Sequence, residues 1–349
     1  MIKEALETLI RGENLSVELA YQVMCSIMEG KLNDSQLAAY LVALRCKGET
    51  VDEIVGSTLA IRRYGIHIKT DRNPVVDTCG TGGDASGSFN ISTVSTFVIA
   101  GAGVAVAKHG NRAVSSRSGS ADLLETLGVN IQLSFKNTEE CLNKAGIGFL
   151  FAPLMHPAMA HAVPVRKTLG IRTIFNILGP LCNPAGVKRQ VIGVYNNILT
   201  KTLAEVVRTI GVEHALIVCG VDGMDEITLS GETQVVEIRA RETLTYRIKP
   251  EDFGFNRVPL YAVKGRDAEE SAQICMRVLK GEKGPHRDVV LLNSAAALYV
   301  AGSVENLKEG IVMAQRSIES GAALDKLRFL QRYPQKNALV KHKGGIAYA

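Results

Sequence analysis

The sequence lacks closely spaced cysteine pairs and long apolar runs, and each absence excludes a class of protein. Its seven cysteines form no CxxC pair and no cysteine–histidine cluster, which argues against a zinc module or a disulfide-stapled fold. No apolar run reaches the roughly 18 to 20 residues of a membrane helix. Residues 1–16 mix charges with apolar residues, unlike a signal peptide. We therefore expect a soluble, cytoplasmic protein with reduced thiols and no membrane partner.

The sequence also lacks a strong charge imbalance, since its formal net charge is only +5. A mild positive charge suits attraction of a small polyanion, but it is far from the charge density that by itself indicates nucleic acid. Glycine is abundant, with 33 residues in a chain of 349 that is 46% hydrophobic. This composition favours an α/β protein with tight strand-to-helix turns, and the length suggests about two domains of roughly 150 residues.

The first seventy residues predict a small helical bundle. Apolar residues recur there at three- and four-residue spacing over four stretches. These stretches are residues 2–11, 16–29, 34–47 and 51–64. Glycines separate the stretches, and Thr50 with Glu53 matches a capping box at the start of the fourth.

The pattern changes after Asn73-Pro74, where short apolar runs begin to alternate with helical stretches. The runs expected as strands are residues 75–78, 104–107, 148–151 and 215–219. The helical stretches among them are residues 92–102, 120–127 and 138–145. A β-rich patch at 233–248 and amphipathic helices over 288–333 follow. This alternation predicts a sheet with crossover helices.

A glycine-rich segment follows the first expected strand. Gly80, Gly82 and Gly83 lie within four residues, and a hydroxyl-rich stretch from Ser88 to Thr93 then opens a helix. Glycines let a backbone approach a ligand closely, and the free N–H groups at a helix start bind anions. The segment therefore indicates a phosphate or pyrophosphate site, although an ordinary glycine-rich turn produces the same pattern.

A basic segment, residues 108–122, follows the next expected strand. It carries three cations, one histidine and four serines within fifteen residues. Because α/β proteins place ligands at the carboxyl ends of their strands, we expect these side chains to donate to phosphate oxygens. A solvated basic loop is the alternative interpretation.

Two adjacent carboxylates, Asp225 and Glu226, follow a later apolar strand. Mg²⁺ bound to a diphosphate typically takes one or two protein carboxylates, so the pair predicts a metal site. A polar turn is the alternative, but the position at a strand end favours the metal. Farther back, Arg166 lies in a proline-containing apolar stretch. It could hold a substrate carboxylate, or its stem could simply cover a core surface.

These segments, taken in order, resemble the anthranilate phosphoribosyltransferase family of tryptophan biosynthesis, and the resemblance covers essentially the whole chain. The segments that carry it are DTCGTGGD, NIST, KHGNRAVSS, VRKTLGIRTIFNILGPLCNPA and DGMDE. One departure is Ala160, at a position where the family pattern leads us to expect lysine.

The resemblance implies an α/β fold class with two domains. A small N-terminal α-helical domain, residues 1–72, would stand beside a large α/β domain, residues 73–349, with a central mostly parallel sheet and C-terminal helices. Part of residues 163–184 would return to the helical domain. Two chains would form a homodimer through their helical domains.

Carried over by matching motif, the resemblance also implies the site residues. Phosphoribosyl pyrophosphate (PRPP) would contact Gly80, Gly83, Asp84, Ser88, Asn90, Ile91, Ser92, Thr93, Lys108, His109, Gly110, Asn111, Arg112, Ala113, Val114, Ser115, Ser116 and Ser120. Mg²⁺ would contact Ser92, Asp225 and Glu226. Anthranilate would contact Gly80, Asn111 and Arg166, with His109 and His156 along its path.

The implied reaction joins the amine of anthranilate to the anomeric carbon of PRPP and releases pyrophosphate. Mg²⁺ and the basic segment would stabilise charge on the leaving group, and Arg166 would hold the anthranilate carboxylate. His109 is the candidate acceptor for the amine's proton, with a water molecule or a purely structural role as alternatives. The rival functions are a nucleoside phosphorylase and a nucleic-acid-binding member of the same fold; we expect no nucleic-acid partner.

Overall fold

The computed structural model describes residues 1–113, 118–240, 242–333, 341–342 and 345–346. Four helices open the chain and confirm the expected bundle. They are α1 (Ile2–Ile10), α2 (Val17–Met28), α3 (Asp34–Lys47) and α4 (Val51–Tyr64). The predicted capping box is present at α4, where the carboxylate of Glu53 accepts the N–H of Thr50 at 2.8 Å.

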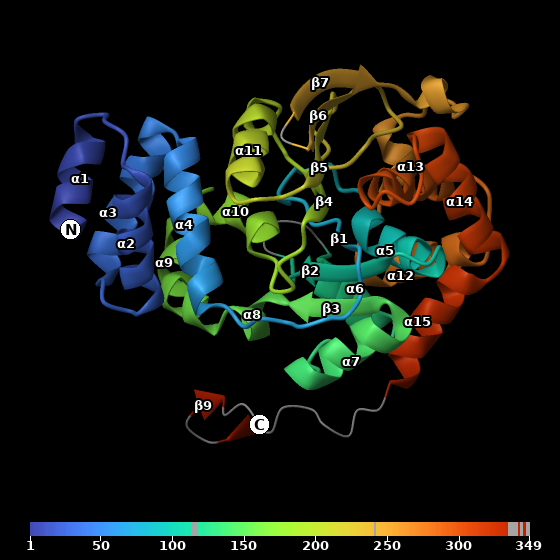
Figure 1. The fold of residues 1–349 in the computed structure, drawn as a ribbon, viewed down its shortest axis with the longest axis horizontal. Helices are drawn as coiled ribbons and strands as arrows, with labels where there is room; N and C mark the ends of the chain where they lie inside the picture. The colour runs from blue at the N-terminus through green and yellow to red at the C-terminus, as the bar shows by residue number, and fades with distance from the viewer. Residues whose placement is uncertain (114–117, 241, 334–340, 343–344, 347–349) are drawn as a thin grey trace.

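The bundle is completed by a segment that comes much later in the sequence. Helix η1 (Pro157–Ala162) contacts α2, and α9 (Val163–Leu169) contacts α3. Val165 and Phe175 are buried in the same apolar cluster as the helices of the bundle. Figure 1 shows α9, in green, lying beside the blue N-terminal helices.

A seven-stranded sheet forms the centre of the rest of the chain, in the order β3-β2-β1-β4-β5-β6-β7. The strands are β1 (Val75–Asp77), β2 (Ala105–Gly110), β3 (Ile147–Phe151), β4 (Arg189–Gly193), β5 (His214–Gly220), β6 (Thr233–Arg239) and β7 (Glu242–Ile248). The first five strands in the chain run parallel, and β6 and β7 continue the sheet antiparallel to β5 and to each other. The predicted α/β class with a mostly parallel sheet is therefore confirmed.

Helices cover both faces of this sheet. Those that follow the bundle and make up the rest of the fold are α5 (Ile91–Gly101), α6 (Ser120–Thr126), α7 (Phe135–Ala145), α8 (Ala152–Met155), α10 (Phe175–Leu178), α11 (Ile198–Thr209), α12 (Ala268–Leu279), α13 (Pro285–Val300), α14 (Leu307–Glu319) and α15 (Ala322–Arg332), with short 3₁₀ turns η2 (Gly179–Cys182), η3 (Pro250–Phe253) and η4 (Leu260–Val263). None of the helices in the described part of the chain is long and apolar enough to cross a membrane. A two-residue pairing, β8 (Lys341–His342) with β9 (Gly345–Ile346), lies near the C-terminus.

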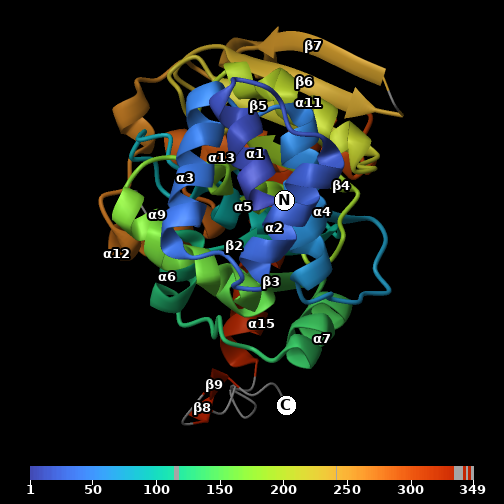
Figure 2. The same cartoon turned by 90° about the vertical axis from the view of Figure 1, so that its left-hand side faces the viewer.

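Alternate residues of the buried strand β5 supply two separate cores. Leu216 and Val218 belong to the cluster that includes α5 and α13, whereas Ala215 and Ile217 belong to the cluster shared with α11 and the bundle. This is the two-residue period of a strand buried on both faces. Figure 2, with the bundle toward the viewer, shows β6 and β7 at one edge of the sheet.

Two details of the sheet differ from the sequence-based expectation. Strand β2 continues through Gly110 rather than ending at Ala107, because Lys108, His109 and Gly110 pair with the last residues of β3. Strand β4 was not predicted. It is short and begins with two polar residues, Arg189 and Gln190, so its sequence lacks the longer apolar run that indicates a buried strand.

The strand order creates a crevice at the centre of the sheet. From β1 the chain passes to β2 and β3 on one side, and it later returns to β4 and β5 on the other side. In open parallel sheets, ligands bind beyond the carboxyl ends of the strands at such a reversal of order. The segments that follow β1, β2, β4 and β5 all emerge at this edge.

Candidate active site

The glycine-rich segment leaves β1 and runs alongside the end of β4. The N–H of Thr81 donates to the carbonyl of Gly193 at 2.8 Å, and the N–H of Tyr195 donates to the Thr81 hydroxyl at 3.3 Å. Gly82 and Gly83 then have φ of +67° and +73°, in the left-handed region that favours glycine. The turn therefore lies in the crevice between the two strands.

Glycine is also required where the loop that carries Asp225 and Glu226, here called the acidic loop, approaches the turn. A Cβ atom on Gly80 would lie 2.7 Å from Oδ2 of Asp225, and one on Gly193 would lie only 1.5 Å from the Asp225 carbonyl oxygen. Side chains at either position would displace Asp225. The glycine-rich turn and the acidic loop, far apart in sequence, are thus in direct contact.

Asp225 and Glu226 each accept a backbone hydrogen bond from the predicted phosphate site. The N–H of Gly82 donates to Oδ2 of Asp225 at 2.7 Å, and the N–H of Ser92, in the first turn of α5, donates to Oε1 of Glu226 at 3.1 Å. The backbone N–H of Asp225 donates to Oδ2 of Asp84 at 3.4 Å. Carboxylates from two separate motifs, Asp84 and the Asp225–Glu226 pair, therefore lie together.

The negative charge in this cluster is crowded. Burial and the neighbouring charge of Asp84 raise the pKa of Asp225, and burial and the charge of Asp225 raise the pKa of Glu226. A divalent cation would relieve this crowding, and carboxylate and hydroxyl oxygens are the donors that Mg²⁺ prefers. The residues present therefore fit Mg²⁺. No cage of three or more acidic, histidine or cysteine side chains occurs in the described ranges.

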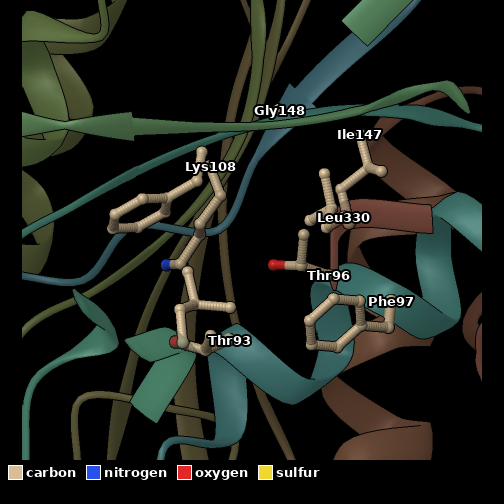
Figure 3. A pocket seen from close by; sticks show the side chains of 9 residues that line it. Thr93, Thr96, Phe97, Lys108, Ile147, Gly148 and Leu330 are labelled. Atoms are coloured by element: carbon tan, nitrogen blue, oxygen red, sulfur yellow. The ribbon is translucent and has the colours of Figure 1, made fainter. Parts of the chain in front are cut away.

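Lys108 is buried, only 4% exposed, beside these carboxylates. Its ammonium donates to the carbonyl of Thr78 at 2.8 Å and to the hydroxyl of Ser92 at 3.3 Å. Figure 3 shows the side chain reaching from β2 towards α5, next to Thr93. The cavity beside it, about 10 Å³, has room for a water molecule at most and cannot hold either substrate. Among the described residues, two acceptors engage the three ammonium protons, so the third proton is open to a ligand.

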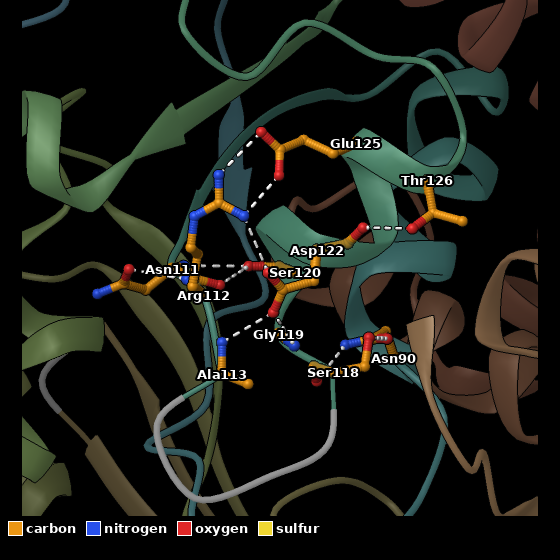
Figure 4. A network of polar contacts seen from close by, with 10 residues as sticks. All are labelled: Asn90, Asn111, Arg112, Ala113, Ser118, Gly119, Ser120, Asp122, Glu125 and Thr126. Carbon is orange, nitrogen blue, oxygen red and sulfur yellow. Dashed lines mark hydrogen bonds and ion pairs between the residues drawn. The ribbon is translucent and has the colours of Figure 1, made fainter. Parts of the chain in front are cut away.

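The described ends of the basic segment are held together by Asp122. Its Oδ2 accepts the N–H groups of Ala113 and Gly119, both at 2.9 Å (Figure 4). The guanidinium of Arg112 pairs with Asp122 at 3.0 Å and donates to Glu125 at 2.8 Å, so two carboxylates already engage it. Val114, Ser115 and Ser116, predicted on PRPP, lie outside the described residues.

The other predicted PRPP residues flank this segment and the start of α5. Ser120 accepts the N–H of Asn111 at 3.1 Å, and the amide of Asn90 donates to the Ser118 carbonyl at 3.1 Å. Ser88 forms an isolated antiparallel bridge with Lys264. Ile91 and Thr93 are buried in the first turn of α5, and Gly110 ends β2. These contacts join the basic segment to the phosphate-binding turn.

The two predicted histidines pack against each other in the interior. The rings of His109 and His156 meet edge-to-face with centroids 5.2 Å apart. Nδ1 of His109 lies 3.0 Å from the carbonyl of Gly179, which makes it the donor, while Nε2 has no partner among the described residues. Burial and the neighbouring His156 lower the pKa of His109 to about 3, and burial lowers the pKa of His156 to about 4. Both rings are therefore neutral at physiological pH.

Arg166 lies near the end of α9 with its side chain half-buried. Its guanidinium carbon is 4.9 Å from the centroid of the Phe175 ring. No carboxylate and no hydrogen-bond acceptor in the described part of the chain holds the guanidinium, and burial lowers its pKa. A half-buried cation without a counter-ion is suited to an anionic ligand.

Three residues at the site were not singled out from the sequence. Arg172 donates from Nη2 to the carbonyl of Gly83, and its guanidinium carbon lies 4.0 Å from the centroid of the Tyr195 ring. Asn183 donates to Oδ2 of Asp77 at 2.7 Å, and Gln190 donates to the Pro180 carbonyl at 2.9 Å. These contacts join the segment around Arg166 to the sheet. Recognising β4 would have pointed to Gln190, but the other pairings have no local sequence signal.

Comparison with known proteins agrees with this arrangement. A model of the glycosyl transferase family, a/b domain, matches residues 72–324, and the helical bundle domain of that family matches residues 3–65. An anthranilate phosphoribosyltransferase of Acetivibrio thermocellus is 50% identical over 327 residues, which are 94% of this chain and 95% of that protein. The chain belongs to the anthranilate phosphoribosyltransferase family.

Solved structures of the family support the same assignment. The enzyme of Thermus thermophilus is 44% identical, with a TM-score of 0.89 over 94% of this chain and 98% of that one. The enzyme of Saccharomyces cerevisiae in complex with PRPP and Mg is 29% identical, with a TM-score of 0.87 over 94% of this chain and 96% of that one. The yeast enzyme in complex with 4-fluoroanthranilate is 27% identical, with a TM-score of 0.85 over 95% and 96% of the chains.

Membership of the family confirms the predicted enzyme class. The chain transfers the phosphoribosyl group of PRPP to the amine of anthranilate, a step of tryptophan biosynthesis. This activity replaces the two alternatives considered from the sequence, a nucleoside phosphorylase and a nucleic-acid-binding protein of the same fold.

Proposed function

We propose that PRPP binds with Mg²⁺ where the segments after β1, β2 and β5 meet, and that anthranilate binds beside Arg166. One observation carries the proposal: Gly82 and Ser92 donate backbone hydrogen bonds to Asp225 and Glu226 respectively, which joins the phosphate-binding turn to the acidic pair. The yeast relative binds PRPP and Mg in this family's fold, and it also binds 4-fluoroanthranilate.

We assign PRPP to the turn and the basic segment. Backbone N–H groups of the glycine turn and of the first turn of α5 would meet its phosphates. The proposed contacts are Gly80, Gly83, Asp84, Ser88, Asn90, Ile91, Ser92, Thr93, Lys108, His109, Gly110, Asn111, Arg112, Ala113, Val114, Ser115, Ser116 and Ser120. Arg112 would have to exchange Asp122 or Glu125 for phosphate oxygens, because both carboxylates hold it in this structure.

Ser92, Asp225 and Glu226 would hold Mg²⁺. When bound, the ion neutralises negative charge that accumulates on a departing pyrophosphate. The protein's own part is to keep three oxygen-bearing side chains converged. Backbone hydrogen bonds from Gly82 to Asp225 and from Ser92 to Glu226 support this arrangement.

Arg166 is proposed to clamp the carboxylate of anthranilate, with Gly80, Asn111, His109 and His156 along its path. A guanidinium already oriented over Phe175 offers a planar fork to a planar carboxylate. Holding the weakly nucleophilic amine next to the anomeric carbon can supply roughly 7 kcal/mol or more. Orientation rather than base strength is therefore the main contribution of these residues.

His109 is proposed to orient the amine of anthranilate rather than to act as the base that removes the amine's proton. Donation from Nδ1 to Gly179 leaves the lone pair on Nε2, so the ring can accept an N–H of the amine. A pKa lowered to about 3 makes the ring a poor permanent acceptor of a proton. The proton released after attack would then pass on to water.

We also propose the domain division and assembly. Residues 1–72 would form the helical domain, part of 163–184 would return to it, and residues 73–349 would form the PRPP-binding domain. Homodimerisation through the helical domain is proposed from the family resemblance. Seven free thiols support a cytoplasmic location.

Titration calorimetry tests the proposed PRPP and metal site. PRPP is added to the wild-type protein and to Gly83→Val, each with and without Mg²⁺. A β-branched side chain at a φ of +73° should abolish PRPP binding, whereas the thermal unfolding of the variant should stay cooperative. PRPP affinity in Gly83→Val equal to that of the wild type would refute the placement. Light scattering on the wild-type protein tests the dimer.

A further inference from the structure

Asn293 holds the backbone that carries the acidic pair. The residue lies in the middle of α13 and is 3% exposed. Its Oδ1 accepts the N–H of Ile227 at 2.9 Å, and its Nδ2 donates to the carbonyl of Ile227 at 2.9 Å. Nδ2 also donates to the carbonyl of Val289, at 2.9 Å, one turn earlier in the same helix. One carboxamide thus satisfies both polar backbone groups of the residue that follows Glu226.

These contacts cannot readily be replaced. Ile227 is 1% exposed, so its N–H and carbonyl would otherwise be buried without partners. Asparagine can pair with both backbone groups of Ile227 because its side chain offers an acceptor oxygen and two N–H donors. The hydrogen bond to Val289 fixes the carboxamide on its own helix, so the direction in which the amide points is also set.

The contact reaches the acidic pair from a different helix than the contact of Ser92. Helix α13 packs against α5, and the first turn of α5 binds Oε1 of Glu226 through the N–H of Ser92. Asn293 therefore fixes the backbone just after Glu226, while Ser92 fixes its carboxylate. Two helices that pack together thus hold neighbouring residues: α5 binds the carboxylate of Glu226, and α13 binds the backbone of Ile227.

We propose that Asn293 is a positioning residue that sets the affinity of the enzyme for Mg²⁺ and for PRPP presented with it. The inference rests on the proposed role of Asp225 and Glu226 as metal ligands. Partners that orient metal ligands typically change metal affinity by about 10- to 100-fold when they are replaced. Anthranilate, which is assigned to Arg166, should not depend on Asn293.

The test compares Asn293→Asp and Asn293→Ser with the wild-type protein. Asn293→Asp keeps the shape and one acceptor but turns an oxygen towards the carbonyls of Ile227 and Val289. Asn293→Ser introduces no charge and shortens the side chain, so it stays informative if the aspartate variant does not fold. Ser294→Ala is the matched control, because Ser294 is the next residue of α13, is fully buried and has no hydrogen-bond partner for its hydroxyl among the described residues.

Calorimetry with MgCl₂ and PRPP provides the first readout, and steady-state kinetics at several Mg²⁺ concentrations the second. We expect both Asn293 variants to bind PRPP in the presence of Mg²⁺ about 10- to 100-fold more weakly. Their KM for anthranilate should stay within about twofold, and high Mg²⁺ should restore part of kcat. Ser294→Ala should match the wild type in all three quantities.

Two outcomes would overturn the inference. A folded Asn293 variant with wild-type Mg²⁺ and PRPP affinity would show that the contact is only structural. An equal rise of KM for both substrates would show a general loss of order. Running Asp225→Asn/Glu226→Gln in parallel separates this inference from the metal proposal. If that double variant keeps its Mg²⁺ dependence, the metal assignment fails whatever the Asn293 variants do.

Discussion

The guanidinium of Arg166 lies over the ring of Phe175, with its central carbon 4.9 Å from the ring centroid. Both residues belong to the segment that follows β3 and rejoins the helical bundle, so the arrangement is built within one short piece of chain. A position over the ring restrains the guanidinium but satisfies none of its N–H donors. The cation is therefore oriented and still available.

We expect Arg166→Ala to raise the KM for anthranilate selectively. A hydrogen bond to a charged group contributes about 1.5 to 3 kcal/mol, which corresponds to roughly a ten- to more than hundredfold change in binding. The KM for PRPP should stay nearly unchanged. Steady-state kinetics with each substrate varied in turn measures both quantities.

Arg208→Ala is a suitable control for that experiment, because Arg208 is a half-exposed arginine that pairs with Glu205 on α11. It should leave both KM values unchanged. If Arg166→Ala weakens both substrates equally, or lowers only the thermal stability, Arg166 is a surface-covering arginine and not the carboxylate clamp.

We expect Asp225→Asn with Glu226→Gln to remove most activity and to raise the Mg²⁺ requirement. The amides keep the size of the carboxylates, and their oxygens can still accept from Gly82 and Ser92, so the fold should survive. The charge that attracts a hard cation is lost. Activity measured across a Mg²⁺ series tests this, and full activity at low Mg²⁺ would show that the loop is only a polar turn.

The helical bundle was predictable because its signals are local. Spacing of apolar residues and the Thr50–Glu53 capping box are readable without knowing any tertiary contact. Strand β4 was not predictable in this way, since Arg189 and Gln190 are polar and only the neighbours β1 and β5 make the segment a strand. The extension of β2 through Gly110 likewise depends on its pairing with β3.

The types of residue at the site were predictable from the sequence, but the contacts between them were not. Glycines, adjacent carboxylates and a strand-end position indicated phosphate and metal. The contact between Gly82 and Asp225 links residues 143 positions apart, and no local pattern specifies it. Asn293 lies inside an apolar helix, where one amide in the sequence gives no sign of its partner.

Arg172 offers a further prediction at the phosphate-binding turn. Its guanidinium lies over the ring of Tyr195 and donates to the carbonyl of Gly83, which connects the segment after α9 to that turn. We expect Arg172→Gln to raise the KM for PRPP by roughly three- to tenfold, because one charge-assisted hydrogen bond at an exposed position is lost. Arg257→Gln, at an exposed arginine paired with Glu251, is the control. A wild-type KM for PRPP in Arg172→Gln would show that the turn does not need this contact.

A buried carboxylate far from the crevice gives the last prediction. Glu237 of β6 is 4% exposed. Its Oε1 lies 2.8 Å from Nε2 of His214 and accepts the hydroxyl of Tyr299 at 2.9 Å, while Oε2 accepts the hydroxyl of Tyr246 at 2.9 Å. His214 is the first residue of β5, so the cluster lies at the end of that strand opposite to the acidic loop. Its loss should affect stability and not catalysis.

Burial alone would raise the pKa of Glu237, but the hydrogen bonds from His214, Tyr246 and Tyr299 outweigh it and hold the pKa below its ordinary value. A carboxyl group whose pKa is lowered on folding stabilises the fold above its unfolded pKa, and that contribution disappears as the pH falls through the folded value.

Replacing one acceptor of a charged network costs about 1.5 to 3 kcal/mol. Glu237→Gln should therefore be less stable than the wild type at pH 7 by about that amount, and the difference should shrink as the pH falls below about 4. Urea unfolding at a series of pH values measures it. Glu232→Gln, at an exposed carboxylate paired with Arg247, should show almost no difference at any pH. A gap between Glu237→Gln and wild type that stays constant with pH would mean that the carboxylate's charge contributes nothing to the cluster.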